Sequence, residues 1–302
     1  ASEYLRIYFL GLPFLFMYNV LSAMFNALGK SRIPLYFLIF SSIFNVILDI
    51  IMVTKMDMGV AGVATATVVS ECISAVLIVQ CLARSDSAYR LCREKMRITE
   101  SKVKQIMKIG LPAGFQGAIF SVSNVLIQSS INSFGSIAMA GSTASANVEG
   151  FVYNAMNAVY QTTLSFTSQN YGAGKMDRVT KILLDCLGLV VLVGVVMGGG
   201  AVLLGPKLLQ IYSSDPEVIS YGMMRMRIIN GSYFLCGIMD TMVGGLRGLG
   251  HSVVPMLVSL TGACLFRVVW IFSVFAMHRT VTTLYLSYPV KNGCREMLNI
   301  WI

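Results

Sequence analysis

Five carboxylic side chains lie inside long apolar stretches of this chain, where an ionisable group is costly. They are Asp49, Glu71, Glu149, Asp185 and Asp240. Charged groups within a membrane-spanning segment are rare and mark ion or substrate pathways. Burial disfavours the charged form of a carboxyl, so such a group can hold a proton near neutrality and release it when water or a cation approaches. Two ligands that compete for one carboxylate are thereby coupled.

The position of each acid within its stretch separates functional candidates from structural ones. Asp185 lies one turn into its stretch, four residues after a lysine, which indicates an ion pair at the membrane interface. Asp49 lies near the end of a stretch, where it can reach lipid headgroups. Glu71, Glu149 and Asp240 lie near the middle of theirs, and we predict that they take part in cation coupling. For each of them a protonated, hydrogen-bonded structural carboxyl is the alternative.

Amide side chains occur along two neighbouring apolar stretches, 109–134 and 136–171, the first of which carries no charge. The candidates for a substrate site are Gln116, Asn124, Gln128, Asn154 and Asn157. Amides at near-helical spacing either hydrogen-bond neighbouring helices or line a wet cavity, and the spacing leaves both interpretations open.

The sequence gives little support for a metal site or for enzyme activity. The seven cysteines are scattered, and no pair has metal-ligand or redox spacing. The two histidines fall in predicted loops, so neither a metal site nor a cofactor is predicted. Paired-aspartate, His-Glu-x-x-His and Gly-x-Ser-x-Gly motifs are absent, which argues against an intramembrane enzyme.

The composition is that of a membrane protein. Hydrophobic residues make up 56% of the chain and charged residues 12%, and the mean hydropathy is +0.72. A soluble domain carries roughly 25% charged residues. Eight segments reach the ~20 residues that cross a bilayer: 7–29, 34–53, 59–83, 109–134, 136–171, 179–205, 228–246 and 253–277. Because backbone groups in lipid must be satisfied internally, these segments predict an all-α polytopic fold, with a further helix starting near Thr280.

The basic residues behind the net charge of +9 are concentrated in alternate loops. The basic loops hold Lys30 and Arg32, then Arg84, Arg90, Arg93, Lys95, Arg97, Lys102 and Lys104, then Lys175, Arg178 and Lys181. The intervening loops are poor in basic residues, as the positive-inside rule expects for alternating sides of a membrane. We therefore expect the basic loops to face the cytoplasm and no nucleic acid to bind. We also expect a monomeric multi-pass protein of the plasma (inner) membrane, with small-molecule substrates and the lipid bilayer as partners.

An internal repeat organises the chain. Residues 5–38 and 226–259 align at a fixed offset, with the closest match between 27–34 and 248–255. An even number of predicted helices separates the copies, which predicts parallel repeats and a two-lobe bundle. Asn19 aligns with Asp240, so the copies differ at this depth. The first copy lacks a counterpart of the residues between Glu100 and Ser214, so we expect the chain to be a fragment with a truncated first lobe.

The repeat and the charges together predict the domain boundaries. Residues 1–83 form the C-terminal half of the first lobe, with three helices, and 84–104 form a cytoplasmic linker. Residues 105–290 form the second lobe, with five helices and the start of a sixth. Three charges within 291–302 interrupt the last apolar stretch, which marks this tail as atypical and as the end of a fragment.

Several motifs resemble those of the multidrug and toxic compound extrusion (MATE) family. They are FTSQNYGAGK at 166–175, LRGLG at 246–250, GLP at 11–13 and 110–112, and MGVAGVA at 58–64. The resemblance runs in order over residues 2–290 and implies twelve helices in two lobes of six, of which this chain holds helices four to eleven and the start of twelve. One departure is Phe120, which stands where some members carry a glutamate of the cation site.

The resemblance implies a secondary-active efflux antiporter that exchanges Na⁺ or H⁺ for amphipathic, often cationic, organic compounds. The two lobes would rock about a central site. The alternative is a lipid-linked oligosaccharide flippase or polysaccharide exporter of the same superfamily. A flippase should line its cavity with several basic residues, whereas Arg267 is the one cation near the middle of a predicted span. Arg247 ends its span, where snorkelling and helix capping account for it.

Overall fold

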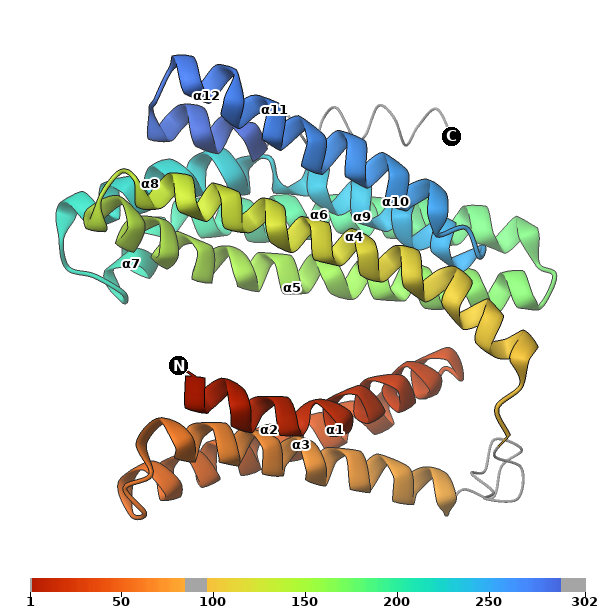
Figure 1. Ribbon diagram of the computed structural model, residues 1–302. Helices are drawn as coiled ribbons and strands as arrows, with labels where there is room; N and C mark the ends of the chain where they lie inside the picture. Colours follow the sequence, from red (N-terminus) through yellow and green to blue (C-terminus); the bar gives the residue numbers. More distant parts are fainter. Residues whose placement is uncertain (1, 85–96, 289–302) are drawn as a thin grey trace. The chain divides into compact units, whose positions relative to one another are not determined.

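A computed structural model describes residues 2–84 and 97–288, and all regular structure in these ranges is helical (Figure 1). The all-α membrane architecture is therefore confirmed. The chain divides into two compact units, residues 1–99 and residues 100–302. Most of the predicted linker and the whole atypical tail, 291–302, lie outside the described residues.

The first unit holds three long helices, α1 (Ser2–Ala27), α2 (Arg32–Thr54) and α3 (Gly59–Ala83). Helix α3 packs against both of the others. Its buried Ile78 packs with Phe25 of α1, and the Ser41 hydroxyl of α2 donates to the Ser70 carbonyl of α3 at 2.9 Å. Gly11 lets α1 approach α3 closely, because a Cβ there would lie 2.8 Å from a methyl group of Val68.

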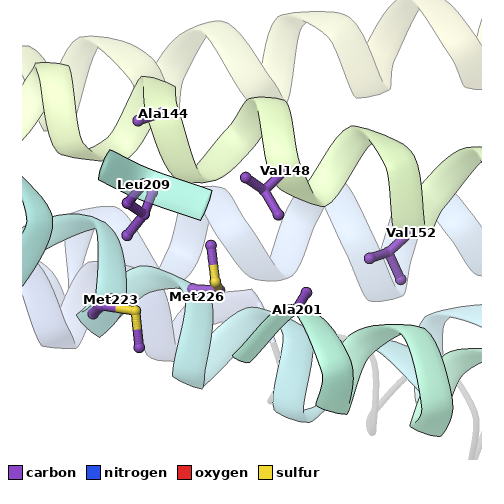
Figure 2. Close-up of a cluster of buried hydrophobic side chains, with 7 residues drawn as sticks. All are labelled: Ala144, Val148, Val152, Ala201, Leu209, Met223 and Met226. Carbon is purple, nitrogen blue, oxygen red and sulfur yellow. The ribbon is translucent and has the colours of Figure 1, made fainter. Parts of the chain in front are cut away.

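The second unit is built around the longest helix of the described chain, α5 (Ser136–Gly172). It packs against α6 (Met176–Leu203), α8 (Pro216–Gly231) and α9 (Tyr233–Gly248). Figure 2 shows the apolar cluster where α5 meets α6, α7 (Gly205–Gln210) and α8: Ala144, Val148, Val152, Ala201, Leu209, Met223 and Met226. Burial of this cluster holds together the helices that carry the charged residues described below.

Two glycines set the crossing of α5 and α8. A Cβ on Gly141 would lie 2.5 Å from the Val218 carbonyl oxygen, and a Cβ on Gly222 would lie 3.1 Å from the Gly141 carbonyl oxygen. Only glycine allows the two backbones to approach this closely. The crossing fixes which residues further along α5 and α8 face each other.

The predicted span 228–246 is wrong in its boundaries. The structure replaces it with α8 and α9, which meet at a break at Ser232. The Ser232 hydroxyl donates to the carbonyl of Ile228 at 3.0 Å, and Gly-Ser pairs are common sites of helix kinks. Helix α8 begins well before residue 228, because Asp215 caps it by accepting from the Glu217 backbone N–H at 2.9 Å and Pro216 occupies its first position.

The predicted span 253–277 also contains irregularities. Helix α10 (Val253–Ser259) passes into a π-helical turn (Leu260–Leu265), which is followed by α11 (Phe266–Phe272) and the short α12 (Val274–Met277). Helix α4 (Glu100–Asn132) begins well before the predicted span 109–134 and is continuous through Pro112. Residues 281–288 are helical, and Leu284 and Tyr285 are buried against Ile127 of α4.

Within the described ranges, six helical segments are long and apolar enough to cross a membrane: α1, α2, α3, α4, α6 and Val253–Met277. They correspond to six of the eight predicted spans. The remaining two are α5, which has the length but more polar residues, and the α8–α9 pair, of which each helix has 16 residues. Helices α5, α8 and α9 contribute polar side chains to the cavity described next, as do α4 and α11.

Candidate functional site

A cavity of about 630 Å³ lies within the second unit. Helices α4, α5, α8, α9 and α11 contribute to it, together with Tyr288 of the last described helical segment. From α5 the lining residues are Ala146, Glu149, Gly150, Tyr153, Asn157 and Tyr160, which recur once per helical turn, with the adjacent Glu149 and Gly150 sharing one turn. One face of α5 therefore forms one wall of the cavity.

A buried ion pair joins two helices at this wall. Arg225 of α8 donates to both carboxylate oxygens of Glu149, from Nε to Oε1 at 2.9 Å and from Nη2 to Oε2 at 2.8 Å. The guanidinium also donates to the Ser142 hydroxyl at 2.7 Å, and the Ser145 hydroxyl donates to Glu149 at 2.9 Å. Both charged residues are less than a tenth exposed. The carboxylate predicted to bind a coupling cation is thus already held by a cation of the protein.

Sequence reasoning missed Arg225, because the predicted span began at 228. A search for continuous apolar stretches does not detect a helix that has one polar face. A signal for the correct start was nevertheless present, since Asp215, Pro216 and Glu217 form an N-cap, a first-turn proline and a first-turn acid. A helix started there would have placed Arg225 in its interior.

Arg247 lies at the end of α9 and turns inward. It donates from Nη1 to the Tyr160 hydroxyl at 2.8 Å and from Nη2 to the Gln116 side-chain oxygen at 2.6 Å. Gln116 in turn donates to the Ser259 hydroxyl at 2.8 Å, so these groups form a connected network. The expectation that Arg247 snorkels to the membrane surface is therefore wrong.

Close helix packing directs Arg247 to this place. A Cβ on Gly244 would lie 3.0 Å from the Tyr160 carbonyl oxygen, and a Cβ on Gly248 would lie 2.7 Å from Thr167. These glycines bring the end of α9 against α5. The inward face of α9 at residue 247 then points at Tyr160 rather than at lipid.

A third guanidinium comes from Arg267 of α11, just after the π-helical turn. It donates to the Asn124 side-chain oxygen at 2.8 Å and to the Ser123 hydroxyl at 3.4 Å. It also lies over the ring of Tyr288, 4.7 Å from the centroid, and Arg225 lies 5.8 Å from the same centroid. Both guanidinium groups thus lie within cation–π distance of the Tyr288 ring.

Asp240 lines the cavity from α9 and is half-buried. It precedes Arg247 by seven residues, which is two turns, so the two side chains share one face of α9. Tyr153 and Tyr233 line the same cavity as Asp240. An acid, a cation and two phenols therefore face one space.

Some of the other predicted site residues line the cavity, and others lie outside it. Gln116, Asn124, Gln128 and Asn157 line the cavity, as does Phe120. Asn154 does not, because it follows Tyr153 by one residue and points about 100° away from it around α5. Glu71 belongs to the first unit, where its buried Oε2 has no hydrogen-bond partner among the described residues.

The charges that face the cavity are mostly positive. Three guanidinium groups and two carboxylates belong to the described lining, which includes no lysine or histidine. One guanidinium and one carboxylate neutralise each other in the Arg225–Glu149 pair. No cluster of three metal-binding side chains occurs in the part of the chain that the structure describes.

Comparisons with known proteins place this architecture among transporters. A family model described as MatE matches residues 112–272, and one described as lipid II flippase MurJ matches residues 1–97. The probable multidrug resistance protein NorM of Thermotoga maritima is 26% identical over 86% of this chain and 56% of its own length. The probable multidrug resistance protein YpnP of Bacillus subtilis is 26% identical over 86% of this chain and 58% of its own. The chain therefore spans a little over half the length of these relatives.

Solved structures share the fold. A crystal structure of MATE in complex with MaL6 superposes with a TM-score of 0.91 at 16% identity, covering 99% of this chain and 68% of that one. An outward-facing multidrug resistance MATE family transporter of the MOP superfamily superposes with a TM-score of 0.88 at 17% identity, covering 99% and 68%.

Proposed function

The chain belongs to the MatE family of membrane transporters, and we propose that it acts in a secondary-active multidrug efflux antiporter of the plasma membrane. This transporter would exchange Na⁺ or H⁺ for amphipathic organic compounds. The relatives named as multidrug resistance proteins support efflux, and the six long apolar helices support a multi-pass membrane location.

The observation that carries the proposal is the position of Asp240 in the cavity. The volume of about 630 Å³ falls within the range of roughly 300–1,000 Å³ that drug-sized ligands occupy. Asp240 faces this space beside amides and phenols that can orient a ligand. A proton or Na⁺ on Asp240 and a cationic group of a substrate would compete for the same carboxylate, and this competition couples their movements.

The ion pair changes the role that we propose for Glu149. A carboxylate that accepts two hydrogen bonds from a guanidinium already has its charge balanced. Glu149 is therefore proposed to hold α5 and α8 together, and the cation-coupling role is assigned to Asp240.

The substitution Asp240→Asn tests the assignment in a full-length transporter that contains this chain. We expect ion-coupled efflux of a dye such as ethidium to be lost, because an amide cannot exchange a proton or Na⁺, while expression and membrane insertion stay near normal. Asp185→Asn is the matched control, since Asp185 is an exposed acid of α6 outside the cavity lining. Unchanged efflux with unchanged dependence on pH and Na⁺ in Asp240→Asn would rule out this assignment.

A second candidate is flipping of a lipid-linked oligosaccharide. Two observations favour it: the match of residues 1–97 to the MurJ model, and the three arginines that line the cavity. The argument against a flippase from the sequence, that Arg267 is the one cation near the middle of a span, does not hold in the structure, because Arg225 and Arg247 also line the cavity. Proteoliposomes loaded with a fluorescent lipid-linked oligosaccharide would distinguish the candidates, because a flippase exposes the label to an external quencher and a drug antiporter does not.

A further inference from the structure

The charge of the cavity around Arg247 points to a further substrate class beside the organic cations that Asp240 would attract. We propose that the cavity of the second unit binds amphipathic organic anions, and that Arg247 recognises the carboxylate, sulfonate or phosphate group of the ligand. This inference rests on the proposed transport function and concerns which compounds the site accepts.

The first argument comes from the partners of Arg247. Its two side-chain hydrogen bonds go to the hydroxyl of Tyr160 and the amide oxygen of Gln116, which are both neutral. No ion pair between Arg247 and a carboxylate occurs among the described residues. Neutral dipoles orient a guanidinium without cancelling its charge. A guanidinium has five N–H donors, so donors remain for a ligand.

The second argument comes from the carboxylates. Glu149 is fully engaged by Arg225 and cannot also balance Arg247. Asp240 is the other acid of the described lining and lies two turns from Arg247 along α9, about 10 Å along the helix axis. The cavity near Arg247 is therefore electropositive. Such a region attracts anions and repels cations, and the low dielectric of a lobe within the membrane strengthens both effects.

The third argument comes from the walls between the charges. Phe120 of α4, Tyr153 of α5 and Tyr233 of α9 line the cavity with aromatic rings, and Ile229 and Val243 add aliphatic surface. These residues suit an apolar body, and the guanidinium suits a planar or tetrahedral anionic head, to which arginine donates two parallel hydrogen bonds. The ligand expected from this lining has an aromatic or aliphatic body and one acidic group.

Two ligands of equal shape and opposite charge test the inference: 2-naphthalenesulfonate and 2-naphthyltrimethylammonium. Each is titrated against the full chain in nanodiscs of phosphatidylcholine, with empty discs as background, and binding is followed by naphthalene fluorescence. We expect the sulfonate to bind at least about tenfold more tightly than the ammonium compound, as expected of a hydrogen bond between charged groups.

The variant Arg247→Met keeps the length of the side chain and removes its charge. It should weaken sulfonate binding about tenfold and leave ammonium binding unchanged or stronger. Arg178→Met is the matched control, because Arg178 is exposed and lies outside the cavity lining, and it should change neither affinity. Arg247→Lys keeps the charge but not the paired donors, so it should retain part of the sulfonate binding, and this retention separates loss of recognition from loss of folding.

A second arm identifies the source of the anion. Adding anionic phosphatidylglycerol to the discs should displace the sulfonate if the site accepts lipid headgroups, and should leave it bound if the site accepts soluble anions. Either result supports an anion site. Equal or tighter binding of the ammonium compound, no binding of the sulfonate, or unchanged sulfonate binding by Arg247→Met would overturn the inference. If ethidium efflux by the full-length transporter persists alongside such a result, the proposed transport function stands and the anion site alone falls.

Discussion

The buried pair of Glu149 and Arg225 allows a quantitative test of how the second unit is held together. Both side chains are less than a tenth exposed, and the two direct hydrogen bonds measure 2.9 and 2.8 Å. Two unit charges 4 Å apart attract by ~4 kcal/mol at the effective dielectric constant of ~20 that suits most protein sites. Removing one member leaves the other charge buried without its counter-ion, which costs about 3–5 kcal/mol.

We therefore expect Glu149→Gln and Arg225→Met each to lower the free energy of unfolding by about 3–5 kcal/mol. The double variant Glu149→Gln/Arg225→Met should be much less destabilised than the sum of the single variants, because no uncompensated charge remains. Ser142 and Ser145 can then donate to backbone carbonyls of α5, as serine commonly does within helices. The coupling energy between the two sites should thus amount to several kcal/mol.

The measurement is reversible unfolding of the purified chain in mixed micelles by increasing denaturant, followed by circular dichroism for the wild type and the three variants. Efflux by the full-length transporter supplies a second readout. If Glu149 is structural, the double variant should keep the wild-type dependence of efflux on pH and Na⁺. The pair would behave like an exposed ion pair if each single variant lowered the free energy of unfolding by less than about 1 kcal/mol. The same conclusion would follow if the losses of the single variants simply added in the double variant. Either result would contradict the reasoning. If the double variant is stable but its efflux no longer depends on pH and Na⁺, Glu149 and not Asp240 would be the cation-coupling residue.

Further predictions concern packing, topology and coupling. Gly141→Ala should destabilise the second unit by about 1–3 kcal/mol, since its Cβ would lie 2.5 Å from the Val218 carbonyl oxygen; Gly150→Ala in the same helix, which meets no atom within 4 Å, should be neutral or stabilising in the same unfolding assay. Reporter fusions should place Lys175 in the cytoplasm and Ser136 outside, and the reverse pattern would refute the assignment of the basic loops. The expected loss of coupled efflux in Asp240→Asn, and the expected loss of sulfonate binding in Arg247→Met, complete the set.

The membrane architecture could be predicted from the sequence because it depends on local properties. An apolar run of about twenty residues specifies a spanning helix wherever it lies in the chain, since lipid leaves the backbone no other way to satisfy its hydrogen bonds. The same holds for the individual side chains. An acid such as Asp240 in an apolar run is costly in any arrangement of helices, so it could be singled out before its neighbours were known.

The grouping of the site depended on the tertiary structure, because the partners are far apart in the chain. Glu149 meets Arg225 across 76 positions, and Gln116 meets Arg247 across 131. Which faces meet is decided by close helix crossings, such as that at Gly141, and a glycine in a sequence does not reveal which backbone will approach it. The sequence thus determined that charged and polar groups are buried in a membrane bundle. Only the packing of α4, α5, α8 and α9 decided that one acid is neutralised and that one arginine faces the cavity with neutral partners.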